Sequence, residues 1–452
     1  MVLLYMKKNV LIFTSMLCIS LLNASPLSLK EAISTALSNS YKQKISQQDQ
    51  AIAKARYNQA LSGNYPFLDI SALANKADDA MVDKVEDKIA IEGLPQPMSV
   101  SYEHTVMGTD TALARADLTY ALYTGGKLSA LQEQASQGMR YAEESSKLTE
   151  DDIILHVRKY FAATVLSEQL LELTQETVDR MKAIKDLTEA FYQGESLSVK
   201  KTDYLRTKMM LFTMQSMLEE MKEKVALAKS ALLFEMGEDQ EKKIELSTEG
   251  LHVKIIPKSL QTYYEAMYFN SHQLKQVEIG LKVRDAQIEE AQSEYLPSLG
   301  LYANAMSLIN NHEGGMINSR NNDSWNVGIG LKYNLFSGGL TSHRVEEAKA
   351  EKLKLEAQSA YLKSGLTLQA KQAFLTLRKS LNQGKILEEA VSVSAENRSL
   401  NFRAYQEDMV PTKDVIEAQI FESITKASYY KARYEALIAK SQLDFIIGKS
   451  FK

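Results

Sequence analysis

The sequence predicts a mostly α-helical protein that also carries a small β-sheet of the membrane-barrel type. Three observations support this fold class. Glycine and proline are scarce, with 20 and 7 residues in a chain of 452, so long uninterrupted helices are expected. The chain contains two copies of one unit. Short segments in which apolar and polar residues alternate lie between the helical stretches.

The composition excludes several classes of protein. The formal net charge is only −4, so a nucleic-acid-binding surface is not indicated. The single cysteine excludes a disulfide scaffold, a zinc ribbon and an iron–sulfur site. The six histidines show no metal-ligand spacing, so we expect no metal and no cofactor.

Residues 1–24 have the pattern of a secretory signal peptide. Lys7 and Lys8 precede an apolar run of about 13 residues, and small residues follow it up to Ala24. The run is too short to cross a bilayer as a helix. A buried core helix is the alternative interpretation. Cleavage after Ala24 would also remove Cys18, the single cysteine.

Two copies of one unit make up the rest of the chain, at 25–256 and 257–452. Pro66 and Pro297 lie 231 positions apart, and the Gly-Gly pairs that follow them lie 213 positions apart. The length differs between the copies in only two places, after Pro66 and after Tyr192. Insertions usually fall in loops, so the stretches of equal length are expected to be regular structure.

Each unit begins with a helix. Apolar residues recur at three- and four-residue spacing in 28–64 and 258–295, which indicates one buried face along each helix. Pro66 and Pro297 end these helices, because proline lacks a backbone N–H and restricts the residue before it.

Strands with a two-residue period follow the helices. Near the end of the second copy, Trp325 and Val327 alternate with Asn326 and Gly328. Apolar residues on one side, polar residues on the other and aromatic residues at the ends are typical of strands in membrane barrels. A half-buried strand of a soluble sheet is the alternative. Four such strands are predicted at 67–75, 112–123, 299–307 and 325–336, and polar loops are predicted at 76–110 and 310–323.

Very long helices come next in each unit. Residues 127–193 and 340–406 contain no proline, and each run would extend about 100 Å at roughly 1.5 Å per residue. The apolar residues of the first run have coiled-coil-like spacing. A short turn and a return helix follow, ending at Gly237 or Gly448. Such hairpins are too thin for a globular core, so they must pack sideways on other hairpins.

The predicted sheet is incomplete within one chain. Closing a barrel takes about eight strands or more, whereas an open sheet would leave unpaired backbone groups in hydrocarbon. The chain must therefore assemble with further copies. A trimer would supply 12 strands, but this argument alone also allows a dimer or a tetramer.

The order of these features resembles that of TolC-type outer-membrane efflux proteins. The resemblance covers nearly all of the mature chain and includes Thr202-Asp203 and the run Asp-Val-Ile-Glu-Ala-Gln at 414–419. It implies a homotrimer with a 12-stranded β-barrel in the outer membrane of a Gram-negative bacterium and a helical α-barrel in the periplasm. It also implies a non-catalytic exit duct of a drug efflux pump or a type I secretion system. The implied partners are a periplasmic adaptor protein and an inner-membrane transporter.

A channel constriction is also implied by the resemblance. Asp414 and Glu417 match carboxylates that narrow the periplasmic end of the duct in this family, and their i, i+3 spacing puts both on one helix face. Three copies would place six carboxylates around one axis, a ring that attracts cations and repels anions. The alternative is a solvated helix start, where acidic residues interact favourably with the helix dipole.

Other residues match the network that keeps the periplasmic tip closed in this family. Tyr405 matches a tyrosine of that network, and Thr202 with Asp203 matches its polar partner on the other hairpin. The basic residue that usually completes the network is replaced by Val410. The nearby basic residues that could substitute for it are Arg403, Lys413, Lys200 and Lys201.

The glycine pairs Gly125-Gly126 and Gly338-Gly339 are predicted at junctions between strand and helix, where glycine lets the chain bend. A phosphate-binding loop is not indicated, because no Gly-Lys-Ser/Thr pattern follows either pair.

One return helix is rich in methionine. Packing is the expected role, because methionine fills irregular helix interfaces. Binding of copper by the thioethers is the alternative. The residues concerned are Met209, Met210, Met214, Met217 and Met221.

The main alternative function is a periplasmic coiled-coil adaptor of the same pumps. Adaptors share a helical hairpin, but usually have one hairpin beside a lipoyl-like domain. The duplication and the alternation at 325–335 favour the channel. An enzyme has no support, since we find neither a nucleophile–base pair nor a nucleotide-binding loop.

Overall fold

The computed structural model describes residues 26–89, 98–194, 198–247, 255–311 and 323–448. The predicted signal peptide at 1–24 lies outside these ranges. The chain divides into two compact units. The hairpin unit comprises residues up to Ala36, Val157–Ile255 and Ser394–Ala427, and the sheet unit comprises Leu37–His156, Ile256–Val393 and the residues from Ser428 onward.

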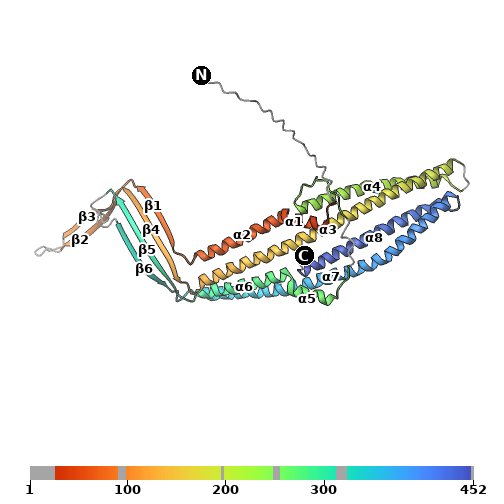
Figure 1. Ribbon diagram of the computed structural model, residues 1–452. Helices are drawn as coiled ribbons and strands as arrows, with labels where there is room; N and C mark the ends of the chain where they lie inside the picture. Colours follow the sequence, from red (N-terminus) through yellow and green to blue (C-terminus); the bar gives the residue numbers. More distant parts are fainter. Residues whose placement is uncertain (1–25, 90–97, 195–197, 248–254, 312–322, 449–452) are drawn as a thin grey trace, which may run out of the picture. The chain divides into compact units, whose positions relative to one another are not determined.

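One series of elements occurs twice along the chain: two helices, two strands, a long helix and a return helix (Figure 1). The first series is α1 (Leu29–Asn39), α2 (Tyr41–Ser62), β1 (Phe67–Lys76), β4 (Asp110–Tyr123), α3 (Lys127–Gln193) and α4 (Lys201–Met236). The second is α5 (Leu260–Asn270), α6 (His272–Ser293), β5 (Ser298–Asn310), β6 (Asp323–Lys332), α7 (Leu340–Gln406) and α8 (Thr412–Ile446).

The prediction of two very long helices is confirmed. Helices α3 and α7 have 67 residues each and have the predicted bounds, 127–193 and 340–406. The return helices α4 and α8 are followed by Gly237 and Gly448, whose φ angles of 69° and 60° lie in the left-handed region. Glycine adopts that conformation without steric cost, which explains why both helices end there.

The prediction of one continuous helix at the start of each unit is wrong. Each stretch is broken at a buried serine: Ser40 separates α1 from α2, and Ser271 separates α5 from α6. At Ser271 the backbone has ψ of 120°, which is extended rather than helical. A Cβ on Gly448 would lie 2.5 Å from the carbonyl oxygen of Asn270, so the end of α8 packs closely on this break.

The four-stranded sheet has the order β1-β4-β5-β6, and all of its pairs are antiparallel. Residues directly opposite each other lie on the same face. β6 ends at Lys332, four residues before the predicted end at 336. One row across the sheet is Leu68, Leu118, Ala303 and Val327, and the adjacent row is Asp69, Asp117, Asn304 and Asn326.

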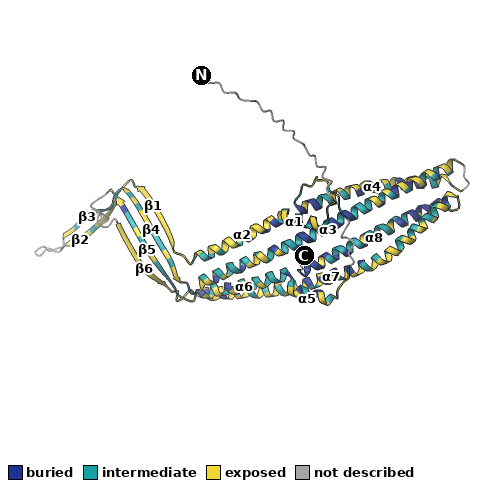
Figure 2. Ribbon diagram, in the orientation of Figure 1, coloured by how far each residue is buried: buried dark blue, intermediate teal, exposed yellow. Residues whose placement is uncertain are grey.

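The sheet therefore has one apolar face and one polar face. β1 is exposed along its whole length, and β6 is exposed at nine of its ten residues; both strands are largely yellow in Figure 2. Large apolar side chains share this exposure, with Ile70 at 78% and Trp325 at 77%.

A second correction concerns the predicted polar loop at 76–110. It contains a two-stranded sheet of β2 (Met81–Ile89) and β3 (Met98–Met107). The charged residues of β2 made this stretch look like a loop in the sequence. Lys84 lies directly opposite Glu103, with 2.6 Å between Nζ and Oε1, and opposite charges across a strand pair are favourable. The other predicted loop, 310–323, lies mostly outside the described residues.

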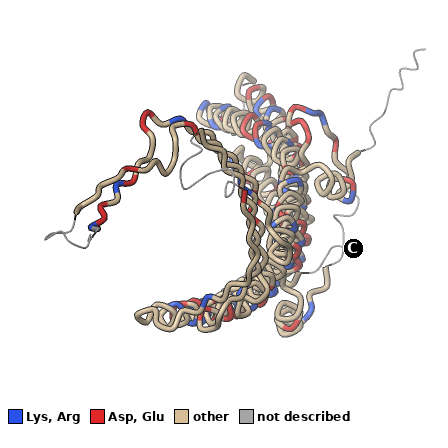
Figure 3. Tube along the Cα trace, turned by 90° about the vertical axis from the view of Figure 1, so that its left-hand side faces the viewer, with Lys and Arg blue, Asp and Glu red and all other residues tan. Residues whose placement is uncertain are grey.

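The core of the hairpin unit is a narrow seam between long helices. It contains Val178, Met181, Ile184, Leu211, Leu218, Tyr405, Val415 and Ile416. Acidic and basic residues are interspersed along the helices, whereas the four-stranded sheet carries few of either (Figure 3). This distribution keeps the apolar seams inside the helical bundle and the charges at its surface.

Within the part of the chain that the structure describes, the helices lack the combination of length and apolarity needed to span a lipid bilayer.

Candidate functional site

The two candidate constriction carboxylates lie in the first turn of α8. Asp414 and Glu417 are both exposed, whereas Val415 and Ile416 between them are 1% and 3% exposed. The opposite face of this turn is thus buried, and both carboxylates point away from it. Glu417 has Lys413 at 3.5 Å, but both side chains are about half exposed or more, so this ion pair holds the carboxylate only weakly.

Tyr405 lies at the centre of a chain of hydroxyl groups and is fully buried. Its hydroxyl oxygen is 2.7 Å from Oγ1 of Thr188 and 3.0 Å from Oγ1 of Thr412. Thr188 donates its own proton to the carbonyl oxygen of Ile184 at 2.7 Å. Because each hydroxyl has one proton, Tyr405 must donate to Thr188 and accept from Thr412.

This hydroxyl chain connects the two hairpins. Thr188 lies near the end of α3, Tyr405 lies at the end of α7, and Thr412 is the first residue of α8. The ring of Phe191 also meets the ring of Tyr405 edge to face, with 5.7 Å between centroids. The end of α7 is therefore fixed to α3 both by a buried hydrogen bond and by aromatic packing.

The predicted partners of Tyr405 lie elsewhere. Asp203 is in the first turn of α4, where its Oδ2 accepts from the backbone N–H of Lys200 at 3.1 Å. Thr202 is exposed beside it. The structure places the hydroxyl of Tyr405 on Thr188 and Thr412 rather than on these two residues. The partners expected from the sequence did not include Thr188, a threonine within the apolar stripe of α3 that carries no local signal of function.

Val410 packs against the same apolar seam as Tyr405. Of the basic residues considered as substitutes, Lys413 pairs with Glu417, and Lys200 gives its backbone N–H to Asp203. The hydrogen bonds of the Tyr405 hydroxyl are to the uncharged hydroxyl groups of Thr188 and Thr412.

The two hairpin turns also contact each other. The hydroxyl of Ser198 donates to Oδ1 of Asp408. Asp408 has φ of 56°, a left-handed conformation that Asp tolerates better than most residues. The turn between α7 and α8 is thereby fixed to the turn between α3 and α4.

Both glycine pairs lie between a strand and a long helix, Gly125-Gly126 ahead of α3 and Gly338-Gly339 ahead of α7. Their φ angles are 64°, 90°, 64° and 87°, all in the region that favours glycine. At Gly125 an added Cβ would also lie 2.7 Å from the carbonyl oxygen of Ser293. The placement fits a structural role for these glycines.

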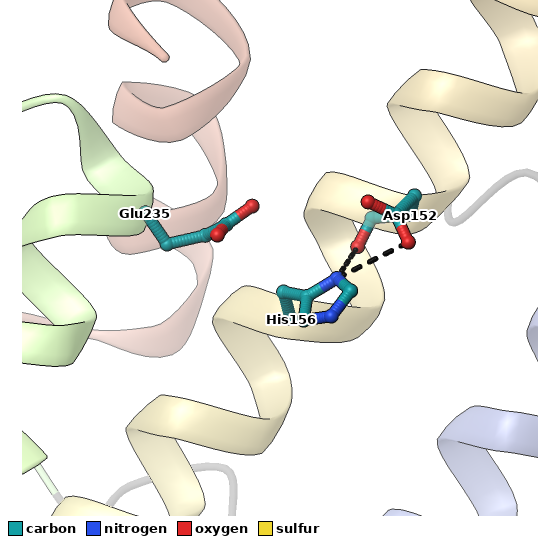
Figure 4. Close-up of side chains that lie close together, drawn as sticks. All are labelled: Asp152, His156 and Glu235. Carbon is teal, nitrogen blue, oxygen red and sulfur yellow. Dashed lines mark hydrogen bonds and ion pairs between the residues drawn. The ribbon is translucent and has the colours of Figure 1, made fainter. Parts of the chain in front are cut away.

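Three histidines of the sheet unit lie at ion-pair distance from a carboxylate: the exposed His343 beside Glu346, and the less exposed His156 and His272. His156 lies one turn after Asp152 on α3, with Nδ1 3.2 Å from Oδ1 (Figure 4). The hydrogen bond to Asp152 raises the pKa of His156 above its ordinary value, against the opposing effect of burial. Lys42 of α2 donates to Oδ2 of the same carboxylate at 3.0 Å.

The third histidine, His272, begins α6. Its Nδ1 lies 2.8 Å from Oε2 of Glu144, and its Nε2 lies 3.6 Å from Oδ2 of Asp151. Burial raises the pKa of Asp151 to about 6, because the charged carboxylate is poorly solvated there. This cluster joins α3 to the break between α5 and α6.

The methionine-rich stretch of α4 divides into two groups. Met210, Met214 and Met221 are buried or pack against the apolar seam, as the packing interpretation predicts. Met209 and Met217 are 60% and 42% exposed and line a shallow groove together with Leu205 and Phe212.

A comparison with protein families finds one match. Residues 264–449 match the family described as outer membrane efflux protein. This match confirms the resemblance seen in the sequence. It also agrees with the expectation that the chain is not an enzyme, because proteins of this family are non-catalytic exit ducts. No curated protein sequence matches the chain.

Solved structures share the fold over most of the chain. The outer membrane protein VceC of Vibrio cholerae is 16% identical, with a TM-score of 0.73, over 94% of this chain and 97% of that one. The CmeC outer membrane channel of Campylobacter jejuni is 15% identical, with a TM-score of 0.76, over 94% and 86%. The MtrE outer membrane channel of Neisseria gonorrhoeae is 14% identical, with a TM-score of 0.73, over 93% and 88%.

Proposed function

We propose that this chain, whose residues 264–449 match the outer membrane efflux protein family, belongs to that family along its whole length and forms an exit channel. Three copies assemble into a homotrimer in the outer membrane of a Gram-negative bacterium. The channel belongs to a tripartite efflux pump or a type I secretion system. Its partners are a periplasmic adaptor protein and an inner-membrane transporter.

The observation that supports this proposal best is the two-faced sheet. Its rows alternate between apolar residues, such as Leu68 and Val327, and polar residues, such as Asp69 and Asn326. The large apolar side chains on the apolar face are exposed in the single chain, Trp325 among them. An apolar face toward lipid and a polar face toward a water-filled lumen would satisfy both sets of residues.

The edges of the sheet supply the argument for assembly. β1 and β6 are its outer strands, and their free backbone groups would need partners in hydrocarbon. Pairing β6 of one copy with β1 of the next provides those partners. Three copies of four strands give a closed 12-stranded barrel, which fits the two repeats at 25–256 and 257–452 and the six hairpins of the trimer.

The helical hairpins form the periplasmic part of the channel in this proposal. Helices α3 and α7 of 67 residues extend about 100 Å, a length suited to reaching an inner-membrane partner. The exposed Asp414 and Glu417 form the constriction near the axis, and Tyr405 keeps that end closed. The signal peptide at 1–24 directs export, and the glycine pairs join barrel to helices.

The location can be tested by membrane fractionation of a Gram-negative host that expresses the full chain. We expect the mature protein in the outer-membrane fraction, resistant to high salt and released only by detergent as a trimer. A soluble periplasmic protein serves as the control for incomplete lysis. Release by high salt without detergent would contradict the channel and favour a peripheral protein.

A further inference from the structure

A buried carboxylate on α8 joins the two helical hairpins at a second place. Glu422 lies two turns beyond Asp414 along α8, and its side chain is 1% exposed. Its Oε2 is 3.0 Å from Nη1 of Arg180 and 2.8 Å from Nε of Arg398. Its Oε1 is 3.0 Å from Nζ of Lys426. The three cations come from α3, α7 and α8 respectively.

These contacts keep a buried charge in place. Burying an ionised carboxylate without partners would cost much free energy. Burial by itself raises the pKa of Glu422, but the hydrogen bond from Arg398, together with the charges of Lys426 and Arg180, outweighs it and holds the pKa below its ordinary value. Arg180 is further oriented by Glu176, 3.1 Å away. Glu422 is therefore ionised at neutral pH.

The three cations have different relations to the hairpins. Arg398 and Lys426 belong to α7 and α8, the same hairpin as Glu422, whereas Arg180 belongs to α3 of the other hairpin. One residue further along α8, Ser423 shares a hydrogen bond of 2.8 Å with Thr177 of α3. The contacts of Arg180 and Thr177 are thus the ones that would break if α8 moved away from α3.

The salt bridge at Glu422 differs from the contacts of the Tyr405 hydroxyl. Around Tyr405 the contacts between hairpins are hydroxyl groups and aromatic rings, and the position where a basic residue was expected is Val410. At Glu422 the hairpins are joined by a contact between two ionised side chains, and charge-assisted hydrogen bonds are stronger than neutral ones.

We propose that Glu422 is a positioning residue that holds α8 against α3 in the closed channel, with Arg180 as the cation that is released on opening. Arg398 and Lys426 stay with Glu422 in both states and keep it ionised. This inference rests on the proposed channel function, because it concerns how that channel is kept shut.

The test is single-channel recording of the purified full trimer in planar bilayers, for the unmodified chain and for Arg180→Gln and Glu422→Gln. Each substitution removes the charged contact across the hairpins, so we expect the ratio of open to closed time to rise roughly tenfold or more. Because both substitutions break the same contact, the double variant should exceed the larger single effect only slightly.

A matched control is Glu435→Gln. Glu435 is a carboxylate of the same helix with a 3.0 Å salt bridge to Lys379, but its partner lies on α7 of its own hairpin. We expect open and closed times unchanged in this variant. Equal effects of Glu435→Gln and Glu422→Gln would mean that any lost salt bridge loosens the bundle, and would overturn the proposal.

A second variant guards against misfolding of the first two. Thr177→Cys with Ser423→Cys places two thiols where hydroxyl oxygens now lie 2.8 Å apart. Under oxidising conditions the disulfide should hold the channel in its low-conductance state, and a reductant should restore normal opening. Normal opening with the disulfide formed would show that α8 does not leave α3, and would refute the lock.

Failure of the lock and failure of the channel give different results. Suppose that the unmodified trimer conducts, and that Arg180→Gln, Glu422→Gln and the disulfide variant all have the same ratio of open to closed time. The proposed role of Glu422 and Arg180 is then wrong, and the proposed channel function is unaffected. If the unmodified trimer gives no conductance and is washed from membranes by salt, both are wrong.

Discussion

Replacing Tyr405 with phenylalanine tests whether the hydroxyl chain keeps the channel closed. The substitution removes one oxygen atom and keeps the ring, so the edge-to-face contact with Phe191 is preserved. It leaves Thr412, which is 3% exposed, without an acceptor and Thr188, which is 0% exposed, without a donor. The loss therefore falls on the hydrogen bonds between α3, α7 and α8.

The size of the effect is estimated from the hydroxyl of Thr412, which loses its acceptor, because Thr188 still donates to the carbonyl oxygen of Ile184. Leaving a buried hydroxyl without its partner costs about 1–3 kcal/mol. We expect the chain of hydroxyl groups to form only in the closed state. The stability of the closed state relative to the open state should therefore fall by that amount. Since about 1.4 kcal/mol corresponds to a factor of ten, the ratio of open to closed time should rise roughly fivefold to 150-fold.

Recordings in planar bilayers measure this ratio directly. Tyr361→Phe is the control, because Tyr361 lies on the same helix but is 83% exposed. Thr188→Val should reproduce much of the effect, and combining it with Tyr405→Phe should add little. An unchanged ratio in Tyr405→Phe, or full additivity of the two substitutions, would refute the reasoning.

Three further predictions follow from the same structure. The double substitution Asp414→Asn with Glu417→Gln should raise the concentration of multivalent cation needed to block the current at least tenfold. An unchanged blocking concentration would exclude these residues from the constriction. Gly125→Ala should lower the thermal midpoint of unfolding more than Gly338→Ala. Both glycines have φ of 64°, so the backbone strain is the same in the two variants. The added Cβ lies within 4 Å of other atoms at Gly125 but not at Gly338. Equal shifts of the thermal midpoint would contradict this steric argument. Finally, the pKa of Asp151 is raised from 3.8 to about 6, so the folded protein holds this proton more tightly than the unfolded chain. The resulting stabilisation, about 3 kcal/mol, is present below about pH 4 and is lost as the pH rises through about 6. The free energy of unfolding, measured in urea between those pH values, should therefore depend less on pH in Asp151→Asn than in the unmodified chain. An unaltered pH dependence would show that Asp151 does not contribute to it.

The long elements could be predicted from the sequence because one simple rule governs each of them. The absence of proline indicated that α3 and α7 are long, the glycine pairs marked where they begin, and the two-residue period gave the strands of the large sheet. The breaks at Ser40 and Ser271 could not be found in this way, since the apolar spacing continues on both sides of a serine that helices tolerate. Their cause is tertiary packing, such as the approach of Gly448 to Asn270.

The hairpin of β2 and β3 was missed for a different reason. Strand β2 is rich in Lys, Asp and Glu, which are depleted in strands on average, and the linear sequence does not show which residues lie opposite them. In the linear sequence, charged residues such as Lys84 and Glu103 are typical of a loop. Only the strand register shows that they lie opposite each other.

The candidate site shows the same limit. The positions of Asp414, Glu417 and Tyr405 came from a resemblance, and the exposure of the two carboxylates agrees with it. Thr188 and Glu422 have no local signal of function: one is a threonine in an apolar stripe, and the other is one of many glutamates on a helix. Their importance arises from the helices packed against them, which only the folded chain specifies.

The most direct test of the central claim is the conductance of the purified trimer in a planar bilayer, with multivalent cations added to one side at a time. We predict stable, discrete conductance steps that are blocked from the side of Asp414 and Glu417 at much lower cation concentration than from the other side. A homogeneous trimer that gives no conductance steps would contradict the account of this protein as a channel.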